Sequence, residues 1–183
     1  MSHSIEDLKT VLSRASLIYN DEQIAQAIDT MAAQINERLK DAQPLLLCVM
    51  NGGLVFTGYL MTRLNCFPQV DYIHATRYRN QTTGTTLNWL AYPSHDLKNR
   101  TVLILDDILD EGITLKAIVE YCREQGAKQV LTAVLVQKKH RRCVADFESD
   151  YVGLEVEDKY VFGFGMDYQS QLRYLNGIYA LNE

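Results

Sequence analysis

The sequence predicts an α/β protein whose open, mainly parallel sheet is flanked by helices. Three short apolar runs are typical of strands buried on both faces: LLLCVM (45–50), TVLIL (101–105) and VLTAVLV (130–136). The first two lead into a glycine-containing turn and then a helical pattern, an alternation that indicates right-handed crossovers. Ligands of such sheets bind beyond the carboxyl ends of the strands, so these two turns are candidate binding sites.

The remaining elements follow in chain order. Residues 22–39 carry apolar side chains at helical spacing, and DAQP (41–44) ends this helix. LVFTGYLMTRL (54–64) is typical of a second helix, and VDYIHAT (70–76) alternates like a strand. A further helix follows the strand at 101–105 and ends before Gly126, because glycine favours helix ends.

Length and composition predict one domain over residues 1–183. The hydrophobic content of 47% and the charged content of 22% are ordinary for a globular protein. The net charge of -5 argues against a nucleic-acid partner, whose binding surface is usually basic. Apolar runs stay below the ~18 residues of a membrane span, and residues 1–16 lack a signal-peptide pattern. We therefore expect a cytoplasmic protein with no membrane partner.

The cysteines and histidines predict neither a disulfide framework nor a structural zinc site. No two cysteines form C-x-x-C, and no two histidines have metal-ligand spacing. These residues are Cys48, Cys66, Cys122 and Cys143, and His3, His74, His95 and His140.

The segment VLILDDILDEGITL (102–115) crowds four acids between a strand and a helix. It matches neither G-x-x-x-x-G-K-[ST] nor G-x-G-x-x-G, and a calcium loop would need oxygen ligands at Leu109 and Ile118. The helix start after Gly112 suits a phosphate, while the acids can accept hydrogen bonds from sugar hydroxyls or help to hold Mg²⁺. We interpret the segment as a ribose 5-phosphate site. An acidic stretch that only stabilises the helix dipole remains the alternative.

This segment resembles the signature of type I phosphoribosyltransferases, which bind phosphoribosyl pyrophosphate. The resemblance implies that Asp106 and Asp107 bind the ribose and Mg²⁺, and that Asp110 is the general base. It also implies a small hood built from the chain ends, and a homodimer or homotetramer. The 5-phosphate loop would comprise Asp110, Glu111, Gly112, Ile113 and Thr114. Many members have Thr where this chain has Glu111, so we expect Glu111 to point away from the phosphate.

Two further stretches are similar to the family, and the second is similar to its hypoxanthine-guanine branch. VMNGG (49–53) is similar to the pyrophosphate loop, which implies contacts from Asn51 and Gly52. Residues 150–168 resemble the closing segment of that branch. The implied roles are purine stacking by Tyr160, purine recognition by the Val161 backbone, metal binding by Asp167 and pyrophosphate binding by Arg173.

The purine-selecting lysine and the closing loop are also implied by the resemblance. Lys138 or Lys139 fits the lysine that reads a 6-oxo group, and Lys138 keeps the family's spacing to Arg141 and Arg142. TRYRNQTTGTT (76–86) occupies the position of the mobile loop, with Arg77-Tyr78 where many members have Ser-Tyr.

The resemblance predicts transfer of the phosphoribosyl group to hypoxanthine or guanine, with Mg²⁺ as cofactor. The partners would be phosphoribosyl pyrophosphate and a 6-oxopurine. Two alternatives stay open: a transferase of the same fold for xanthine or another base, and a non-catalytic regulator that binds phosphoribosyl pyrophosphate.

Overall fold

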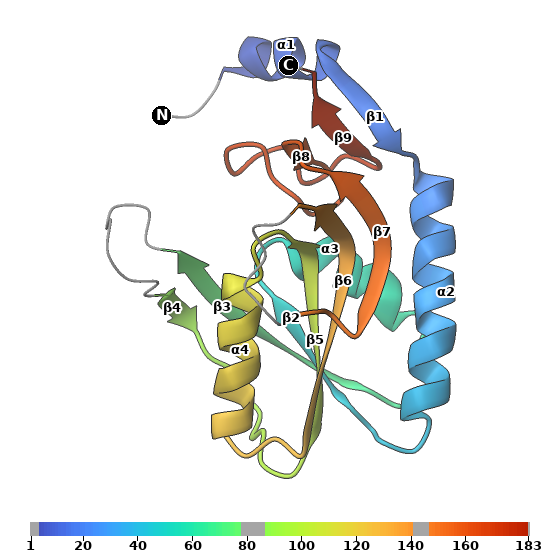
Figure 1. The fold of residues 1–183 in the computed structure, drawn as a ribbon, viewed down its shortest axis with the longest axis vertical. Helices are drawn as coiled ribbons and strands as arrows, with labels where there is room; N and C mark the ends of the chain where they lie inside the picture. Colours follow the sequence, from blue (N-terminus) through green and yellow to red (C-terminus); the bar gives the residue numbers. More distant parts are fainter. Residues whose placement is uncertain (1–3, 78–86, 141–146, 183) are drawn as a thin grey trace.

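The computed structural model describes residues 4–77, 87–140 and 147–182, with only the backbone of Arg77 described. Among them, the main sheet has six strands in the order β4-β3-β2-β5-β6-β7 (Figure 1). All neighbouring strands are parallel except β3 and β4. The elements are α1 (Ile5–Ser13), β1 (Ala15–Tyr19), α2 (Asp21–Leu39), β2 (Leu45–Val49), α3 (Gly53–Met61), β3 (Gln69–Arg77), β4 (Leu87–Ala91), β5 (Thr101–Leu109), α4 (Ile113–Glu124), β6 (Gln129–Lys139), β7 (Tyr151–Glu157), β8 (Val161–Phe162) and β9 (Ile178–Leu181).

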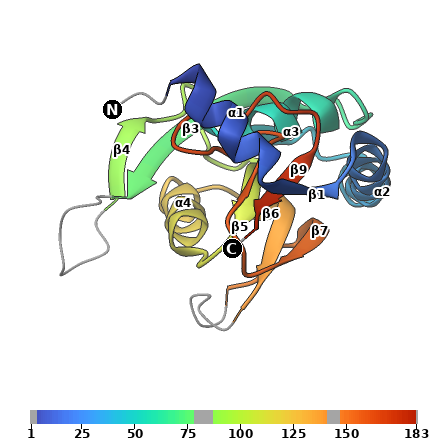
Figure 2. The same cartoon turned by 90° about the horizontal axis from the view of Figure 1, so that it is seen from above.

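Helices cover both faces of this sheet, as the apolar strands require. Alternate strand residues point to opposite faces, so Leu46 packs in the core beneath α2 and α3, while Leu45 and Leu47 pack in the core beneath α4. Seen from above, α4 lies on one side of the sheet and α2 and α3 lie on the other (Figure 2). The predicted open α/β sheet is confirmed.

A second, three-stranded sheet is built from the two ends of the chain, in the order β1-β9-β8. Its strands pair antiparallel, with Ala180 of β9 opposite Ser16 of β1 and Val161 of β8. This sheet lies above the carboxyl ends of the main strands (Figure 1). Its buried residues Val161, Ile178 and Ala180 share a core with the main sheet. The hood expected from the chain ends is confirmed.

The strand that enters the acidic segment is longer than predicted. We expected a strand over 101–105 followed by an acidic turn, whereas β5 continues to Leu109. Its pairing with β6 extends through Asp106 and Ile108 to Leu109, opposite Gln137. Asp106 and Asp107 therefore belong to a strand, and only Asp110 and Glu111 lie in the turn. Along the described part of the chain, no helix is long and apolar enough to cross a membrane.

Candidate active site

Two adjacent carboxylates lie at the carboxyl end of β5. The Asp107 side chain is buried, and its backbone N–H donates to Asp106 Oδ1 at 2.9 Å. Burial, followed by repulsion from Asp107, raises the pKa of Asp106 well above its ordinary value. Burial also raises the pKa of Asp107, against the opposing effects of Asp106 and Arg173. Two buried carboxyl groups this close together are unfavourable when they are ionised. A bound cation or several hydroxyl donors would stabilise them.

The glycine turn after β2 lies directly against these carboxylates. A Cβ at position 52 would overlap the Asp107 carboxylate, so the close approach requires glycine. The Met50–Asn51 peptide bond is cis, and the Asn51 residue is exposed. The glycine turn therefore meets the acidic segment at the carboxyl end of β5, on the edge of the sheet that the sequence predicted.

Arg173 connects this corner to the segment after β8. Its guanidinium donates to Asp167 Oδ1 at 2.8 Å and to the Gly165 carbonyl, and it lies 3.9 Å from Asp107 Oδ2. Asp167 also accepts a hydrogen bond from the Ser170 backbone N–H at 2.6 Å. The predicted pyrophosphate-binding Arg173 thus lies between two of the predicted metal-binding acids.

The proposed base, Asp110, is held by two side chains from the end of β6. Lys138 Nζ donates to Asp110 Oδ2 at 2.9 Å, and His140 Nε2 lies 2.6 Å from Asp110 Oδ1. Burial alone would raise the pKa of Asp110, but the hydrogen bonds from Lys138 and then His140 outweigh it and lower that pKa. Asp110 is therefore ionised at neutral pH, as a proton acceptor must be.

The two candidate lysines point in different directions, as successive strand residues do. Lys139 pairs with Glu155 at 2.7 Å, and its side chain is 53% exposed. Lys138 is only 13% exposed and contacts Asp110. Lys138, and not Lys139, therefore lies beside the acidic segment that ends β5.

The turn from β5 into α4 contains a glycine directly before the first turn of the helix. Gly112 adopts a left-handed backbone with φ of 77°, which glycine accommodates without strain, and α4 begins at the next residue, Ile113. Thr114 and Gly112 line a cavity of about 200 Å³ together with Asp106 and Asp110. The backbone N–H groups of the first helical turn lack partners within the helix and suit an anion there.

The remaining predicted residues are placed as follows. Tyr160 is 49% exposed and donates from its hydroxyl to the Asp167 carbonyl at 3.0 Å. Val161 is buried in β8, opposite Ala180. Arg77 ends β3, while Tyr78 and the rest of the predicted closing loop up to residue 86 lie outside the described residues.

The donor set fits Mg²⁺ that is bound largely through a substrate. Oxygen ligands suit this ion, and it commonly takes only one or two carboxylates from the protein. Asp106 and Asp107 provide such a pair, whereas Asp167 is already bound by Arg173. No group of three or more candidate metal ligands converges within the described ranges. The predicted trio therefore does not form one protein-only metal site.

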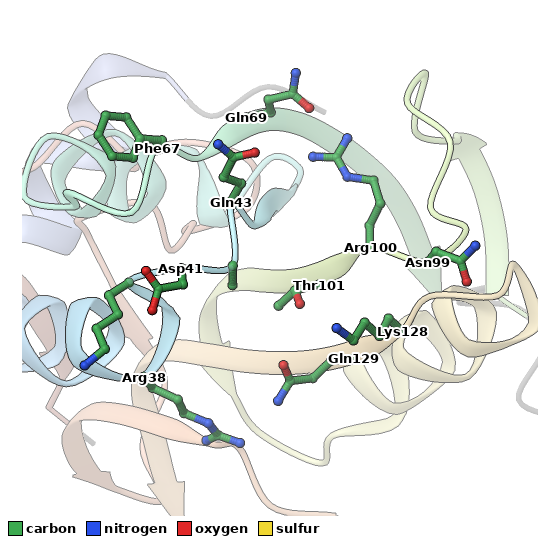
Figure 3. A pocket seen from close by; sticks show the side chains of 12 residues that line it. Arg38, Asp41, Gln43, Phe67, Gln69, Asn99, Arg100, Thr101, Lys128 and Gln129 are labelled. Carbon is green, nitrogen blue, oxygen red and sulfur yellow. The ribbon is translucent and has the colours of Figure 1, made fainter.

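A larger cavity than the one at Gly112 lies at the opposite, amino end of the strands (Figure 3). Its volume is about 820 Å³, and its lining includes Arg38, Lys40, Arg100 and Lys128 but only one acid, Asp41. It contains none of the residues that the sequence singled out.

His140 is the site residue that the sequence analysis missed, because it was considered only as a metal ligand. Its side chain is 5% exposed and points to Asp110. The sequence could have indicated it, because His140 follows directly after the strand that carries Lys138. The carboxyl ends of neighbouring parallel strands lie together at one edge of the sheet.

Comparison with known proteins agrees with this arrangement. Residues 15–171 match the phosphoribosyl transferase domain model. The chain is 29% identical to the hypoxanthine-guanine phosphoribosyltransferase of Bacillus subtilis, over 96% of this chain and 92% of the relative. It is 32% identical to the enzyme of the same name from Staphylococcus epidermidis, over 93% of this chain and 92% of the relative. A solved hypoxanthine phosphoribosyltransferase from Staphylococcus aureus superposes with a TM-score of 0.88 at 25% identity, over 98% of this chain and 97% of that one. The chain belongs to the phosphoribosyltransferase family, in its hypoxanthine-guanine branch.

Proposed function

We propose that the protein transfers the 5-phosphoribosyl group of phosphoribosyl pyrophosphate to hypoxanthine or guanine, giving the nucleoside monophosphate and pyrophosphate. The observation that carries this proposal is the meeting of Gly52, Asp107 and Arg173 at the carboxyl end of β5, the strand that leads through Gly112 into α4. These groups offer backbone amides, carboxylates and a guanidinium at one corner. Together they suit a ligand that carries a phosphate, a diol and a pyrophosphate.

The sugar-phosphate end would be held by β5 and the start of α4. The 5-phosphate binds the N–H groups of the turn from Asp110 to Thr114, where a side chain from Glu111 is not needed. Asp106 and Asp107 accept hydrogen bonds from the ribose hydroxyls and stabilise the positive charge that develops on the sugar. Arg173 and the amides at Asn51 and Gly52 bind the pyrophosphate. Bound Mg²⁺, held by the two aspartates and the substrate, would neutralise charge on this leaving group.

The purine would bind between Tyr160 and the end of β6. The half-exposed ring of Tyr160 offers a stacking surface, and the Val161 backbone lies beside it. Lys138 carries only donors, so it suits a 6-oxo group and disfavours the 6-amino group of adenine. Asp110 accepts the proton from the imidazole ring of the purine.

An exposed apolar surface supports a homodimer or homotetramer. It includes Leu54, Tyr59 and Met61 of α3, Val70 and Tyr72 of β3, and Leu90 of β4, each at least 42% exposed. Ile73 and Ala75 pack in the core beneath α4, so Val70 and Tyr72 must face the α3 side of the sheet. Exposed apolar side chains on these neighbouring elements favour association with a second copy. The sedimentation mass of the purified protein tests this assignment.

The decisive experiment supplies the purified protein with phosphoribosyl pyrophosphate and Mg²⁺, and then with hypoxanthine, guanine, xanthine or adenine separately. We expect Mg²⁺-dependent formation of the hypoxanthine or guanine nucleotide, with adenine rejected. Xanthine belongs in the panel because one relative, from Tritrichomonas foetus, is named a hypoxanthine-guanine-xanthine phosphoribosyltransferase. If no purine yields a nucleotide, the proposal is wrong.

A further inference from the structure

The contacts of Asp110 indicate how recognition of the purine is connected to the chemistry. Lys138 Nζ lies 2.9 Å from Asp110 Oδ2, and His140 Nε2 lies 2.6 Å from Asp110 Oδ1. Both carboxylate oxygens are therefore engaged by protein groups. An ammonium bound to a carboxylate oxygen lowers the basicity of that carboxylate. In this arrangement the carboxylate is a poor proton acceptor.

We propose that a 6-oxopurine activates its own base by drawing Lys138 from Asp110, while His140 keeps the carboxylate in place. This inference rests on the proposed function. The 6-oxo oxygen of the purine accepts the Lys138 ammonium and so replaces Asp110 Oδ2 as its partner. Without the ammonium at Oδ2, Asp110 is more basic and accepts the N–H of the imidazole ring.

The two partners of Asp110 are suited to these different tasks. Lys138 has a flexible four-carbon chain, and its ammonium can move between two acceptors that lie close together. The His140 ring has fewer rotatable bonds and is 5% exposed, so its contact with Oδ1 persists while Lys138 moves. Lys138 is therefore a switch between purine and base, and His140 is a positioning residue.

The chemical step is balanced without a further reactant. The imidazole N–H bond of the purine breaks, and its proton goes to Asp110 Oδ2, giving a neutral carboxyl. The electron pair remains in the purine ring, whose other imidazole nitrogen forms the bond to ribose C1. The C1–O bond to pyrophosphate breaks, and its electron pair leaves with pyrophosphate.

In this arrangement the 6-substituent of the purine affects the rate of turnover as well as the strength of binding. The 6-amino group of adenine donates hydrogen bonds and cannot accept one from an ammonium. Adenine would therefore leave Lys138 on Asp110 and the base inactive. A lysine that only reads the purine would change binding and leave the readiness of the base unaffected.

Unsubstituted purine, which has the imidazole ring but no 6-substituent, separates these two roles. It has no 6-oxo oxygen to accept a hydrogen bond from Lys138, and no 6-amino group to oppose the Lys138 ammonium. We expect its kcat to rise at least about tenfold in Lys138→Met, because the loss of the charged hydrogen bond from Lys138 makes Asp110 a stronger base. The same variant should raise the KM for hypoxanthine. Lys139→Met is the matched control, because Lys139 pairs with Glu155 on the other face of β6.

The role of His140 is tested on hypoxanthine with two variants. His140→Ala should lower kcat by about tenfold to a hundredfold with little change in KM, since Asp110 loses its orientation. His140→Asn should recover part of kcat, because its amide N–H can donate to Oδ1. A merely structural role would give no such rescue.

The outcomes distinguish the inference from the function on which it rests. If the wild-type protein converts no purine at all, the proposed function fails. If it converts hypoxanthine and Lys138→Met leaves the kcat for purine unchanged, the function stands and the exchange is wrong. Equal kcat values for His140→Ala, His140→Asn and wild type would overturn the positioning role.

Discussion

The same strands of the main sheet end in two different environments. At the carboxyl end, Asp106, Asp110, Gly112 and Thr114 line a cavity of only about 200 Å³. At the amino end, a cavity of about 820 Å³ is surrounded by basic side chains (Figure 3). The smaller cavity is lined by two carboxyl groups whose pKa values are displaced in opposite directions, Asp106 and Asp110. Converging polar groups with displaced pKa values locate a candidate site better than cavity volume does.

The charges at the two ends also differ in their partners. At the amino end, Arg38 pairs with Asp150 at 3.2 Å and lies 5.8 Å above the ring of Tyr151, and Lys40 pairs with Glu37 at 3.5 Å. These exposed pairs contribute little and need no ligand. At the carboxyl end, two like charges are held side by side. A bound sugar or cation stabilises only the second arrangement.

The largest predicted effect comes from removing the base at the carboxyl end. Asp110→Asn keeps the shape of the side chain but removes its ability to accept a proton. We expect kcat with hypoxanthine to fall by about 10²–10⁴. Phosphoribosyl pyrophosphate should bind almost as before, since its phosphate interacts with backbone N–H groups. Steady-state kinetics and calorimetry measure the two effects, and normal turnover by this variant would exclude Asp110 as the base.

The next effect is expected from a single methyl group in the pyrophosphate turn. Gly52→Ala places a Cβ within the space of the Asp107 carboxylate, so either the turn or the acid must move. A displacement of about 1 Å at a reacting centre can cost about 10² in rate.

Gly58→Ala is the matched control for this substitution. Gly58 lies in α3, the helix that begins directly after Gly52, and a Cβ at Gly58 meets nothing within 4 Å. We expect it to keep full activity and to stabilise the fold by about 0.5–1 kcal/mol, because alanine favours a helix interior. Equal kcat/KM values for the two variants would contradict the close-approach argument.

The parts of the site that lie in one short segment could be predicted from the sequence. The acids, Gly112 and the helix start are contiguous, so the local sequence pattern alone indicates what these residues can bind. The contact of Asp110 with His140 and that of Arg173 with Asp107 join residues distant in the sequence. Only the folded sheet and hood bring these pairs together, and no local pattern reveals them.

The element boundaries show the same limitation. The predicted strand covered the apolar run at 101–105, and an acidic turn was expected to follow it. Pairing with β6 nevertheless continues to Leu109, since the backbone hydrogen bonds do not depend on the side chains. The strands of the hood are short, and β8 has only two residues, so their apolar patterns are too brief to identify.

A third prediction compares the crowded carboxylates with a buried carboxylate that has its full set of donors. Asp71, near the amino end of β3, accepts from the backbone N–H groups of Tyr72, Ser94 and His95, and it contacts His95 Nδ1 at 2.7 Å. Burial alone would raise the pKa of Asp71, but hydrogen bonds from His95, Tyr72 and Ser94 outweigh it and hold that pKa well below its ordinary value. Asp71→Asn should therefore lower the free energy of unfolding by about 2 kcal/mol at pH 7.

The direction of the pKa shift of Asp71 also predicts how the stability difference between wild type and Asp71→Asn depends on pH. Because the folded pKa of Asp71 is lowered, its contribution is complete above the unfolded pKa of about 3.9 and is lost as the pH falls towards the folded pKa. Urea unfolding at pH 7 and at pH 3 should show a smaller difference between wild type and variant at the lower pH. The exposed Asp96→Asn should change stability by less than about 0.5 kcal/mol at either pH. A difference for Asp71→Asn that grows as the pH falls would contradict the assigned direction.

The smallest effect is expected at the large cavity. Arg100 and Lys128 line it, and their side chains form no ion pair within the portion of the chain that the structure describes. β5 runs for nine residues from Thr101, in this cavity, to Leu109, next to Asp110. At ~3.3 Å per residue, the basic groups lie well beyond a Debye length of about 8 Å from Asp110. The double variant Arg100→Ala/Lys128→Ala should therefore keep kcat and KM within about twofold of wild type at physiological salt. A tenfold change in either constant would mean that the amino end of the sheet takes part in the reaction, and the contrast between the two ends would no longer hold.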